Sequence, residues 1–145
     1  ASFPLNMGGK IVENFAMTFE NGKCVKATAD KNVQNLLDTI NQSESSGYLG
    51  EVALVSKQSP ITKMGVIFYN GLIDENAACH LALGSSFPTN IQGGTTMSKE
   101  ELDQHGVNVA VNHNDFMIGT PHMKVVGKYK DGTEIVIMDD GDFVI

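Results

Sequence analysis

The sequence predicts an α+β domain in which a mixed β-sheet is accompanied by short helices and followed by a terminal β-hairpin. Three observations support this class. Strand-like segments open the chain and recur along it, short helical patterns lie between them, and two strand-like segments around Asp131-Gly132 come last. The 145 residues suffice for one domain with a buried core, and no repeat or linker divides them. We therefore expect residues 1–145 to form a single domain.

The first strands are expected to form a hairpin. Residues 11–19 (IVENFAMTF) alternate imperfectly between apolar and polar types, and residues 24–29 (CVKATA) resume a strand-like pattern. Between them, Asn21-Gly22 is typical of a tight turn in which both central residues have positive φ. This arrangement predicts an antiparallel pair of strands.

The middle of the chain is expected to alternate between helices and buried strands. Asp30 can cap a helix whose apolar residues recur at helical spacing as far as Ile40. Three further segments are predicted, namely the short buried strands 51–56 (EVALVS) and 65–71 (GVIFYNG) and the short helix 75–83 (ENAACHLAL). Asp74 would start that helix and Gly84 would end it.

The last third is expected to contain a capped helix and then strands. Ser98 and Glu101 have the spacing of a capping box, in which each side chain accepts a hydrogen bond from the other residue's backbone amide. This predicts a helix over residues 99–105 (KEELDQH). Strands are predicted over 107–113 (VNVAVNH), 116–119 (FMIG), 124–129 (KVVGKY) and 133–138 (TEIVIM), the last two joined at Asp131-Gly132.

Composition and charge exclude several classes of partner. The formal net charge is -7 and all ten basic residues are Lys, which argues against a nucleic-acid surface. No apolar run approaches the length of a membrane span, and no signal peptide is visible, so we expect no membrane partner and a cytoplasmic protein. Cys24 and Cys79 are expected to be free thiols in a reducing compartment, although their spacing leaves a disulfide open.

The candidate chemistry lies in acids and histidines beside apolar runs. In residues 111–119 (VNHNDFMIG), an extended chain would place His113 and Asp115 on one face and the two asparagines on the other. Glu51 begins an apolar run, where an ionised carboxylate is costly unless it is paired or binds a cation. His80 lies among apolar neighbours in the expected helix. Carboxylates with imidazoles suit Zn, Co, Mn or similar divalent ions, and the lack of thiolate pairs argues against structural zinc.

Spacing alone leaves ordinary explanations open for each of these residues. A carboxylate at a strand edge is usually solvated, a helical histidine usually belongs to the core or surface, and an H-x-D pair usually forms a local hydrogen bond. Other candidates are weaker: His105 falls at a helix C-terminus, His122 follows Pro121 in a turn, and residues 139–142 (DDGD) lack the spaced ligands of a calcium loop. Cys79 and His80 would diverge by about 100° on a helix, which makes a poor catalytic couple.

Five segments resemble the thermophilic-type metalloaminopeptidases, the family of aminopeptidase T and aminopeptidase S (PepS). They are MTFENGK, GYLGEVALV, IFYNGLIDENAACHLALG, MSKEEL and HNDFMIGT, in the order found in the C-terminal half of that family. The likeness runs from about Pro4 nearly to the end of the chain. It implies that residues 1–145 are the C-terminal metal-binding domain of a longer aminopeptidase, an expectation that the start at Ala1 without an initiator Met also favours.

The resemblance implies an activity, a cofactor and a set of ligands. A pair of divalent ions, of Zn, Co, Mn or Mg, would activate water for attack on the first peptide bond of a peptide substrate. Glu51 in GEVALV, His80 in DENAACH, and His113 and Asp115 in H-x-DFM match the metal ligands of the family. Glu51 would also be the carboxylate of the catalytic site. A homodimer is implied as well.

Two departures from the family pattern bear on activity. The family draws a further metal-binding glutamate from just upstream of the segment resembling PLNMGG, and this chain is expected to start too late to contain it. The family also uses a tyrosine, usually in A-Y-P, where this chain reads SSFP; Phe87 stands in that place and cannot donate a hydrogen bond to an oxyanion. Whether Tyr48 or Tyr69 substitutes is left open. We expect the isolated chain to be weak or inactive, with a non-catalytic metal-binding, peptide-binding or dimerisation domain as the alternative.

Overall fold

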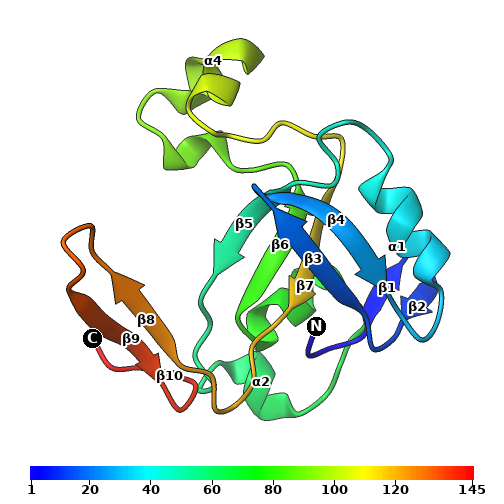
Figure 1. Ribbon diagram of the computed structural model, residues 1–145. Coiled ribbons are helices and arrows are strands. Elements are labelled where there is room, and N and C mark those ends of the chain that lie inside the picture. Colours follow the sequence, from blue (N-terminus) through cyan, green and yellow to red (C-terminus); the bar gives the residue numbers. More distant parts are fainter.

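A central three-stranded sheet organises the molecule (Figure 1). The computed structural model describes residues 1–145 and pairs the strands in the order β5 (Leu49–Ala53), β6 (His80–Gly84) and β7 (His113–Met117). All strand pairs are antiparallel, and they form four small sheets. The expected α+β class, with short helices and a terminal hairpin, is confirmed. Because β6 is hydrogen-bonded on both sides, it brings β5 and β7 close together although they are far apart in sequence.

Two hairpins and one helix precede the central sheet. They are β1 (Leu5–Met7), β2 (Lys10–Val12), β3 (Ala16–Glu20), β4 (Lys23–Thr28) and α1 (Val33–Ile40). The predicted turn is confirmed, since Asn21 and Gly22 have φ values of 50° and 80°. The single strand expected over residues 11–19 is divided at Asn14, whose φ of 48° turns the chain between β2 and β3. At eight residues, α1 is the longest helix, and none is long and apolar enough to cross a membrane.

The hydrophobic core lies between these N-terminal elements and one face of the central sheet. Leu83 and Phe116 contribute from the sheet, and both are less than 5% exposed. The Phe116 ring meets Phe15 edge-on at 6.3 Å and stacks on Phe19 at 6.4 Å between ring centroids. Because side chains alternate along a strand, the neighbours of these residues face away from the core.

The start of α1 differs from the prediction. The helix begins at Val33, after Asn32 in the left-handed region with φ 56°, and not under a cap from Asp30. Instead, the carboxylate of Asp30 accepts a hydrogen bond of 2.8 Å from the side-chain amide of Asn14. The side chain that was expected to cap the helix therefore ties the start of α1 to the turn between β2 and β3.

The strand predicted over residues 65–71 is wrong. The segment is a loop between α2 (Pro60–Met64) and α3 (Gly71–Asp74). The buried carboxylate of Asp74 accepts hydrogen bonds from the backbone amides of Phe68 at 2.9 Å and Asn70 at 3.0 Å. These bonds fold the loop back onto the start of α3, so its apolar residues do not pair with another strand.

The helix predicted over residues 75–83 is also wrong. Asp74 ends α3 and does not start a helix, a short 3-10 turn η1 (Glu75–Ala77) follows, and His80 is the first residue of β6. Gly84 accordingly ends a strand. The alanines favour a helix, but this segment lies between two strands that pair with it on both sides. Ladder hydrogen bonds of a central strand outweigh that local propensity.

The chain between β6 and β7 rises beyond the end of the sheet, at the top of Figure 1. It contains η2 (Pro88–Asn90), η3 (Gly94–Thr96) and α4 (Lys99–Gln104). The capping box is confirmed, because Ser98 N donates to Glu101 Oε2 at 2.7 Å and Glu101 N to Ser98 Oγ at 3.3 Å. The strand predicted over 107–113 is wrong except at its last residue. Carbonyls of this segment accept hydrogen bonds from the Ser85 and Ser86 amides and the Ser45 hydroxyl, and the side chains of Asn108 and Asn112 donate to carbonyls elsewhere, so the segment is held without pairing as a strand.

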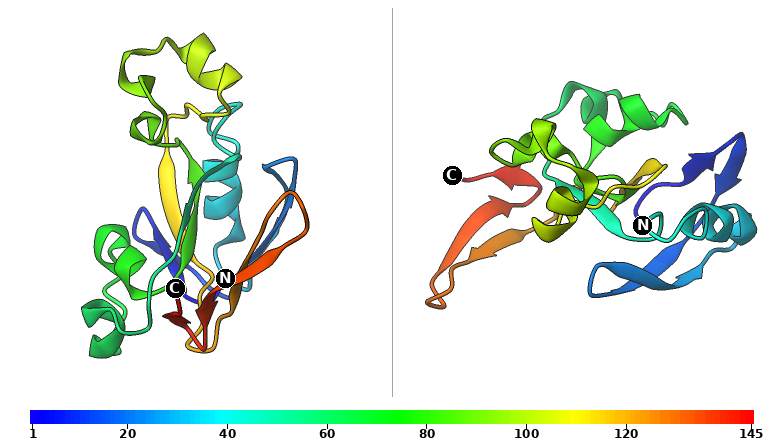
Figure 2. Two further views of the ribbon diagram at one scale, coloured as in Figure 1. Left: turned by 90° about the vertical axis from the view of Figure 1, so that its left-hand side faces the viewer. Right: turned by 90° about the horizontal axis from the view of Figure 1, so that it is seen from above.

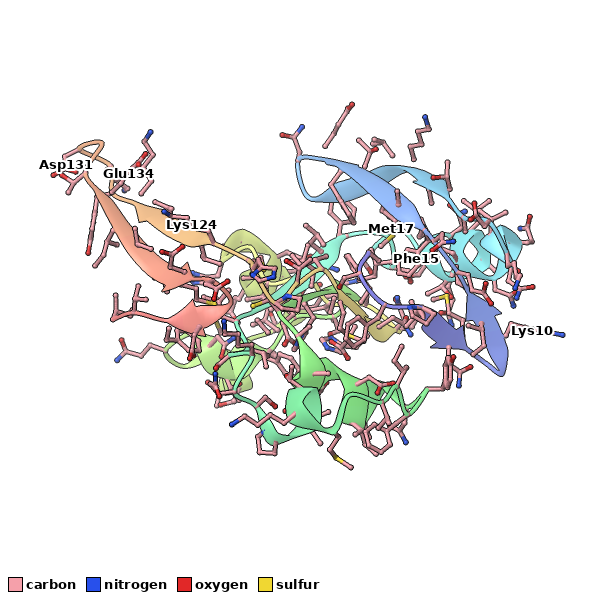
Figure 3. All side chains as sticks on the ribbon, turned by 90° about the horizontal axis from the view of Figure 1, so that it is seen from below. Lys10, Phe15, Met17, Lys124, Asp131 and Glu134 are labelled. Carbon is pink, nitrogen blue, oxygen red and sulfur yellow. The ribbon has the colours of Figure 1, made fainter.

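The terminal hairpin projects from the rest of the molecule (Figures 1 and 2). It comprises β8 (Val125–Lys128), β9 (Glu134–Asp139) and the short β10 (Asp142–Phe143). Figure 3 shows Asp131 and Glu134 at its tip, far from Lys10 on the β1–β2 hairpin. At its base, hydrogen bonds from Lys57 and then His122 lower the pKa of Asp140 to about 2. The DDGD segment is thus a turn that ties the hairpin to the loop after β5.

Candidate metal centre

One face of the central sheet carries four ligand-type side chains. On β6, Ala82 pairs with Glu51 of β5 on one side and with Asp115 of β7 on the other. His80 lies two residues before Ala82, and His113 lies two residues before Asp115. Directly paired residues and residues two apart point to the same side of a sheet. The four side chains therefore share the face opposite the core.

The structure brings all four of these side chains into contact. Ligand atoms of Glu51, His80 and Asp115 lie within 4.8 Å of one another. His80 Nε2 is 3.2 Å from Glu51 Oε1, and His113 Nε2 is 3.2 Å from both Glu51 Oε2 and Asp115 Oδ1. The Glu51 carboxylate thus lies between two imidazoles and directs one oxygen toward each.

Backbone carbonyls determine which nitrogen of each imidazole carries the proton. His80 Nδ1 lies 3.1 Å from the carbonyl oxygen of Ala78, and His113 Nδ1 lies 2.7 Å from that of Ser85. A carbonyl oxygen only accepts, so Nδ1 is the donor in both rings, and the Nε2 of a neutral ring presents a lone pair. In neutral rings both lone pairs would then face carboxylate oxygens, an arrangement that is repulsive unless a cation or an added proton lies between them.

A divalent cation fits these donors. Asp115 Oδ1 is buried and has no hydrogen-bond partner, although His113 Nε2 lies 3.2 Å from it. Leaving such an oxygen unpaired is costly, and a cation would satisfy it together with the two ring nitrogens. Imidazole and carboxylate donors suit divalent ions such as Zn, Co, Mn or Mg. The absence of thiolates argues against a structural zinc site.

Glu75 also belongs to this centre, although the sequence analysis did not single it out. Burial raises the pKa of the Glu75 carboxyl; the charge of Asp115, a hydrogen bond to Asp115 and the charge of Glu51 add to the rise, and His80 opposes it. In the sequence, Glu75 could have been noticed because it lies in the same DENAACH segment as His80. The wrongly predicted helix concealed it, because residues five apart on a helix are rotated by about 140°.

Phe87 lies beside the centre without offering a polar group. Its ring meets the ring of His113 edge-on, with 5.0 Å between centroids, and its residue is 49% exposed. No hydrogen bond joins the hydroxyl of either other candidate, Tyr48 or Tyr69, to the centre. The Tyr48 ring lies 5.5 Å from Lys23 Nζ, and the carbonyl of Tyr69 accepts a hydrogen bond from Asn6.

The weaker candidates have structural roles away from the centre. His105 is the C-cap residue of α4, and His122 pairs with Asp140 at the base of the terminal hairpin. Cys79 adjoins His80 at the start of β6, and its sulfur contacts the backbone of Val55, so it does not join the cluster. Cys24 and Cys79 are both free, as expected, and the structure places both in buried positions.

Carboxylates and imidazoles held together on a rigid sheet, with no thiolate among them, define the kind of centre used by metal-dependent hydrolases. Comparison with known proteins agrees with this class. The chain belongs to the thermophilic metalloprotease family (M29), whose profile matches residues 1–143.

Relatives of known activity cover nearly the whole chain. It is 47% identical to aminopeptidase AmpS of Bacillus subtilis over 140 residues, which are 97% of this chain and 34% of that protein. It is 40% identical over 145 residues to aminopeptidase T of Thermus thermophilus. The solved structure of wild-type AmpT from Thermus thermophilus superposes with a TM-score of 0.91, covering 100% of this chain and 35% of that one. The chain therefore spans about a third of the length of these relatives.

Proposed function

We propose that this chain is the C-terminal, metal-binding part of an aminopeptidase that hydrolyses the N-terminal peptide bond of peptides with two divalent ions. The observation that carries this proposal is the Glu51 carboxylate, which directs one oxygen toward His80 and the other toward His113 at 3.2 Å each. A carboxylate with an imidazole on either side could hold divalent ions together with both rings. The relatives named as aminopeptidases support the reaction.

Each residue of the centre has a distinct role in this proposal. Glu51, His80, His113 and Asp115 would hold the ions. When bound, the ions supply the Lewis acidity that lowers the pKa of water and polarises the scissile carbonyl. Glu75 lies close to Asp115, and burial together with the charge of Asp115 raises the pKa of the Glu75 carboxyl. The negative charges of Glu51 and Asp115 offset the charge of the ions, and the carbonyls of Ala78 and Ser85 keep both rings oriented.

Metal removal tests this function. In the complete protein, we expect up to two divalent ions per chain by mass spectrometry and release of N-terminal residues from peptides. A chelator should abolish turnover, and Zn, Co, Mn or Mg should restore it, because no other group of the centre supplies the same Lewis acidity. A peptide with an acetylated N-terminus serves as the substrate control and should resist cleavage. Undiminished turnover after the ions have been removed would contradict the proposal.

A second function, a non-catalytic metal-binding or peptide-binding domain, is favoured by Phe87 alone. Its ring occupies the position beside His113 where a hydroxyl could donate to an oxyanion. In the complete protein, we expect Phe87→Tyr to raise kcat, by up to the hundredfold that one oxyanion donor is typically worth, and to change KM little.

The matched control is Phe143→Tyr, which adds the same hydroxyl to a half-exposed ring of the terminal hairpin and should leave kcat unchanged. If Phe87→Tyr is no faster than an active wild type, another group already supplies the donor. If neither protein turns over peptides while both bind metal, the non-catalytic function is the correct one.

A further inference from the structure

We infer that Asn108 is a positioning residue of the metal centre: it fixes the backbone carbonyl that holds His113 in its cation-binding tautomer. The inference deepens the proposed function and rests on it. Asn108 lies in the segment that returns from α4 to β7, outside the strands that carry the four ligands. It is half-buried and carries no charge, so neither metal-ligand spacing nor charge would single it out.

The carbonyl in question belongs to Ser85, directly after β6. It accepts the hydrogen bond of 2.7 Å from His113 Nδ1, while Ser85 N donates to the carbonyl of Asn112 at 2.7 Å. The chain leaves the strand at Gly84, whose φ is +101°, and a Cβ there would lie 2.2 Å from the Asn112 oxygen. The position of the Ser85 carbonyl is thus set by a turn that only glycine accommodates at residue 84.

Asn108 holds the peptide groups on both sides of Ser85. Its side-chain nitrogen donates to the carbonyl of Gly84 at 2.6 Å and to that of Ser45 at 2.9 Å, which uses both of its hydrogens. Its own backbone carbonyl accepts from Ser86 N at 2.7 Å. One residue therefore anchors the turn to the chain before β5: its side chain holds the peptide before Ser85, and its backbone carbonyl holds the peptide that contains the Ser85 carbonyl.

Glycines make room for this turn but cannot hold it. A Cβ on Gly50 of β5 would lie 2.3 Å from the Gly84 oxygen and 2.6 Å from the Ser85 oxygen. The two carbonyls thus fill the space beside Gly50 in which a side chain would stand. Because Gly50 and Gly84 have no side chains, the hydrogen bonds of Asn108 are the side-chain contacts that keep the Gly84 carbonyl in place.

The orientation of the Ser85 carbonyl decides whether His113 Nε2 directs a lone pair or a proton toward the centre. With Nδ1 protonated, the Nε2 lone pair faces Glu51 and Asp115. If the Ser85 carbonyl moved away, the proton could shift to Nε2 and form a hydrogen bond to one of those carboxylates. That tautomer would satisfy the carboxylate with a proton and would remove a nitrogen ligand from the centre.

The test compares two imidazoles in one protein. In metal-free Asn108→Ala, nitrogen NMR should show His113 shifting toward the tautomer protonated at Nε2. His80 should stay protonated at Nδ1, because the carbonyl of Ala78 holds it at the other end of β6. Zinc affinity should fall about ten- to hundredfold, the usual cost of losing a partner that orients a ligand. Turnover should recover at saturating zinc.

The controls separate positioning from general damage. Asn90→Ala, at an exposed position of η2, should change neither imidazole nor zinc affinity. Asn108→Asp keeps the shape of the side chain but cannot donate to the two carbonyls, so it should change the His113 tautomer and the zinc affinity as Asn108→Ala does. If Asn108→Ala does not fold, Asn108→Asp tests the inference in its place. An unchanged His113 tautomer in a folded variant, or loss of folding in both variants, would overturn the inference. Failure of the wild type to bind zinc would instead contradict the proposed function, since the tautomer is measured without metal.

Discussion

Asp115→Asn is expected to lower metal affinity and kcat/KM by about a hundredfold or more, because changing a ligand costs at least as much as the roughly 10- to 100-fold typical of losing a partner that orients one. Asp115 is only 9% exposed, and its Oδ1 has no hydrogen-bond partner among the protein groups. Asparagine keeps the shape and one oxygen but removes the negative charge that offsets a cation. The measurement is metal stoichiometry and peptidase activity of the complete protein, for wild type and variant.

A matched substitution and a folding measurement accompany this prediction. Asp103→Asn removes the same charge from an exposed position of α4 and should leave metal content unchanged. Without metal, Asp115→Asn should fold at least as stably as the wild type, because Glu51 and Glu75 repel the charge of Asp115. Normal metal binding and turnover in Asp115→Asn would mean that Asp115 is not a metal ligand.

Phe116→Ala is expected to lower the free energy of unfolding by about 3 to 5 kcal/mol, as removal of a buried phenyl ring generally does. Phe116 is 4% exposed, and its ring contacts the rings of both Phe15 and Phe19. Deleting it leaves a cavity between the central sheet and the N-terminal hairpins. Urea unfolding followed by circular dichroism measures the loss.

Val111→Ala provides the comparison on the exposed side. Val111 is 70% exposed, so its truncation should change the free energy of unfolding by no more than about 0.5 kcal/mol. If Phe116→Ala cost as little as this control, the core would not lie on the face of the sheet opposite the candidate metal centre.

Features governed by neighbouring residues could be predicted from the sequence. Asn21-Gly22 needs only its own backbone preference to form a turn, and Ser98 with Glu101 needs only the first turn of a helix. Residues 65–71 and 75–83 have similar apolar character, yet the first forms a loop and the second contributes a central strand. Their conformation depends on partners from distant parts of the chain, which a local pattern cannot reveal.

The residues of the candidate centre likewise fall into those that the local sequence could group and those that it could not. Alternation along an extended chain correctly placed His113 and Asp115 on one face, and their contact of 3.2 Å follows from it. Bringing Glu51 and His80 to them requires β6 to lie between β5 and β7, and only the family resemblance anticipated that grouping. Glu75 and Asn108 act through neighbours in space, so no spacing rule could identify them.

The middle position of β6 would couple metal binding to the stability of the folded protein. Glu51 and Asp115 lie on the two edge strands, and an ion held by residues of all three strands would fasten both edges to the centre. A ligand that binds only the folded chain adds to its stability in proportion to the logarithm of its concentration over Kd. Cells starved of the ion would then lose this protein to proteolysis as well as to inactivity, and its abundance would follow metal supply.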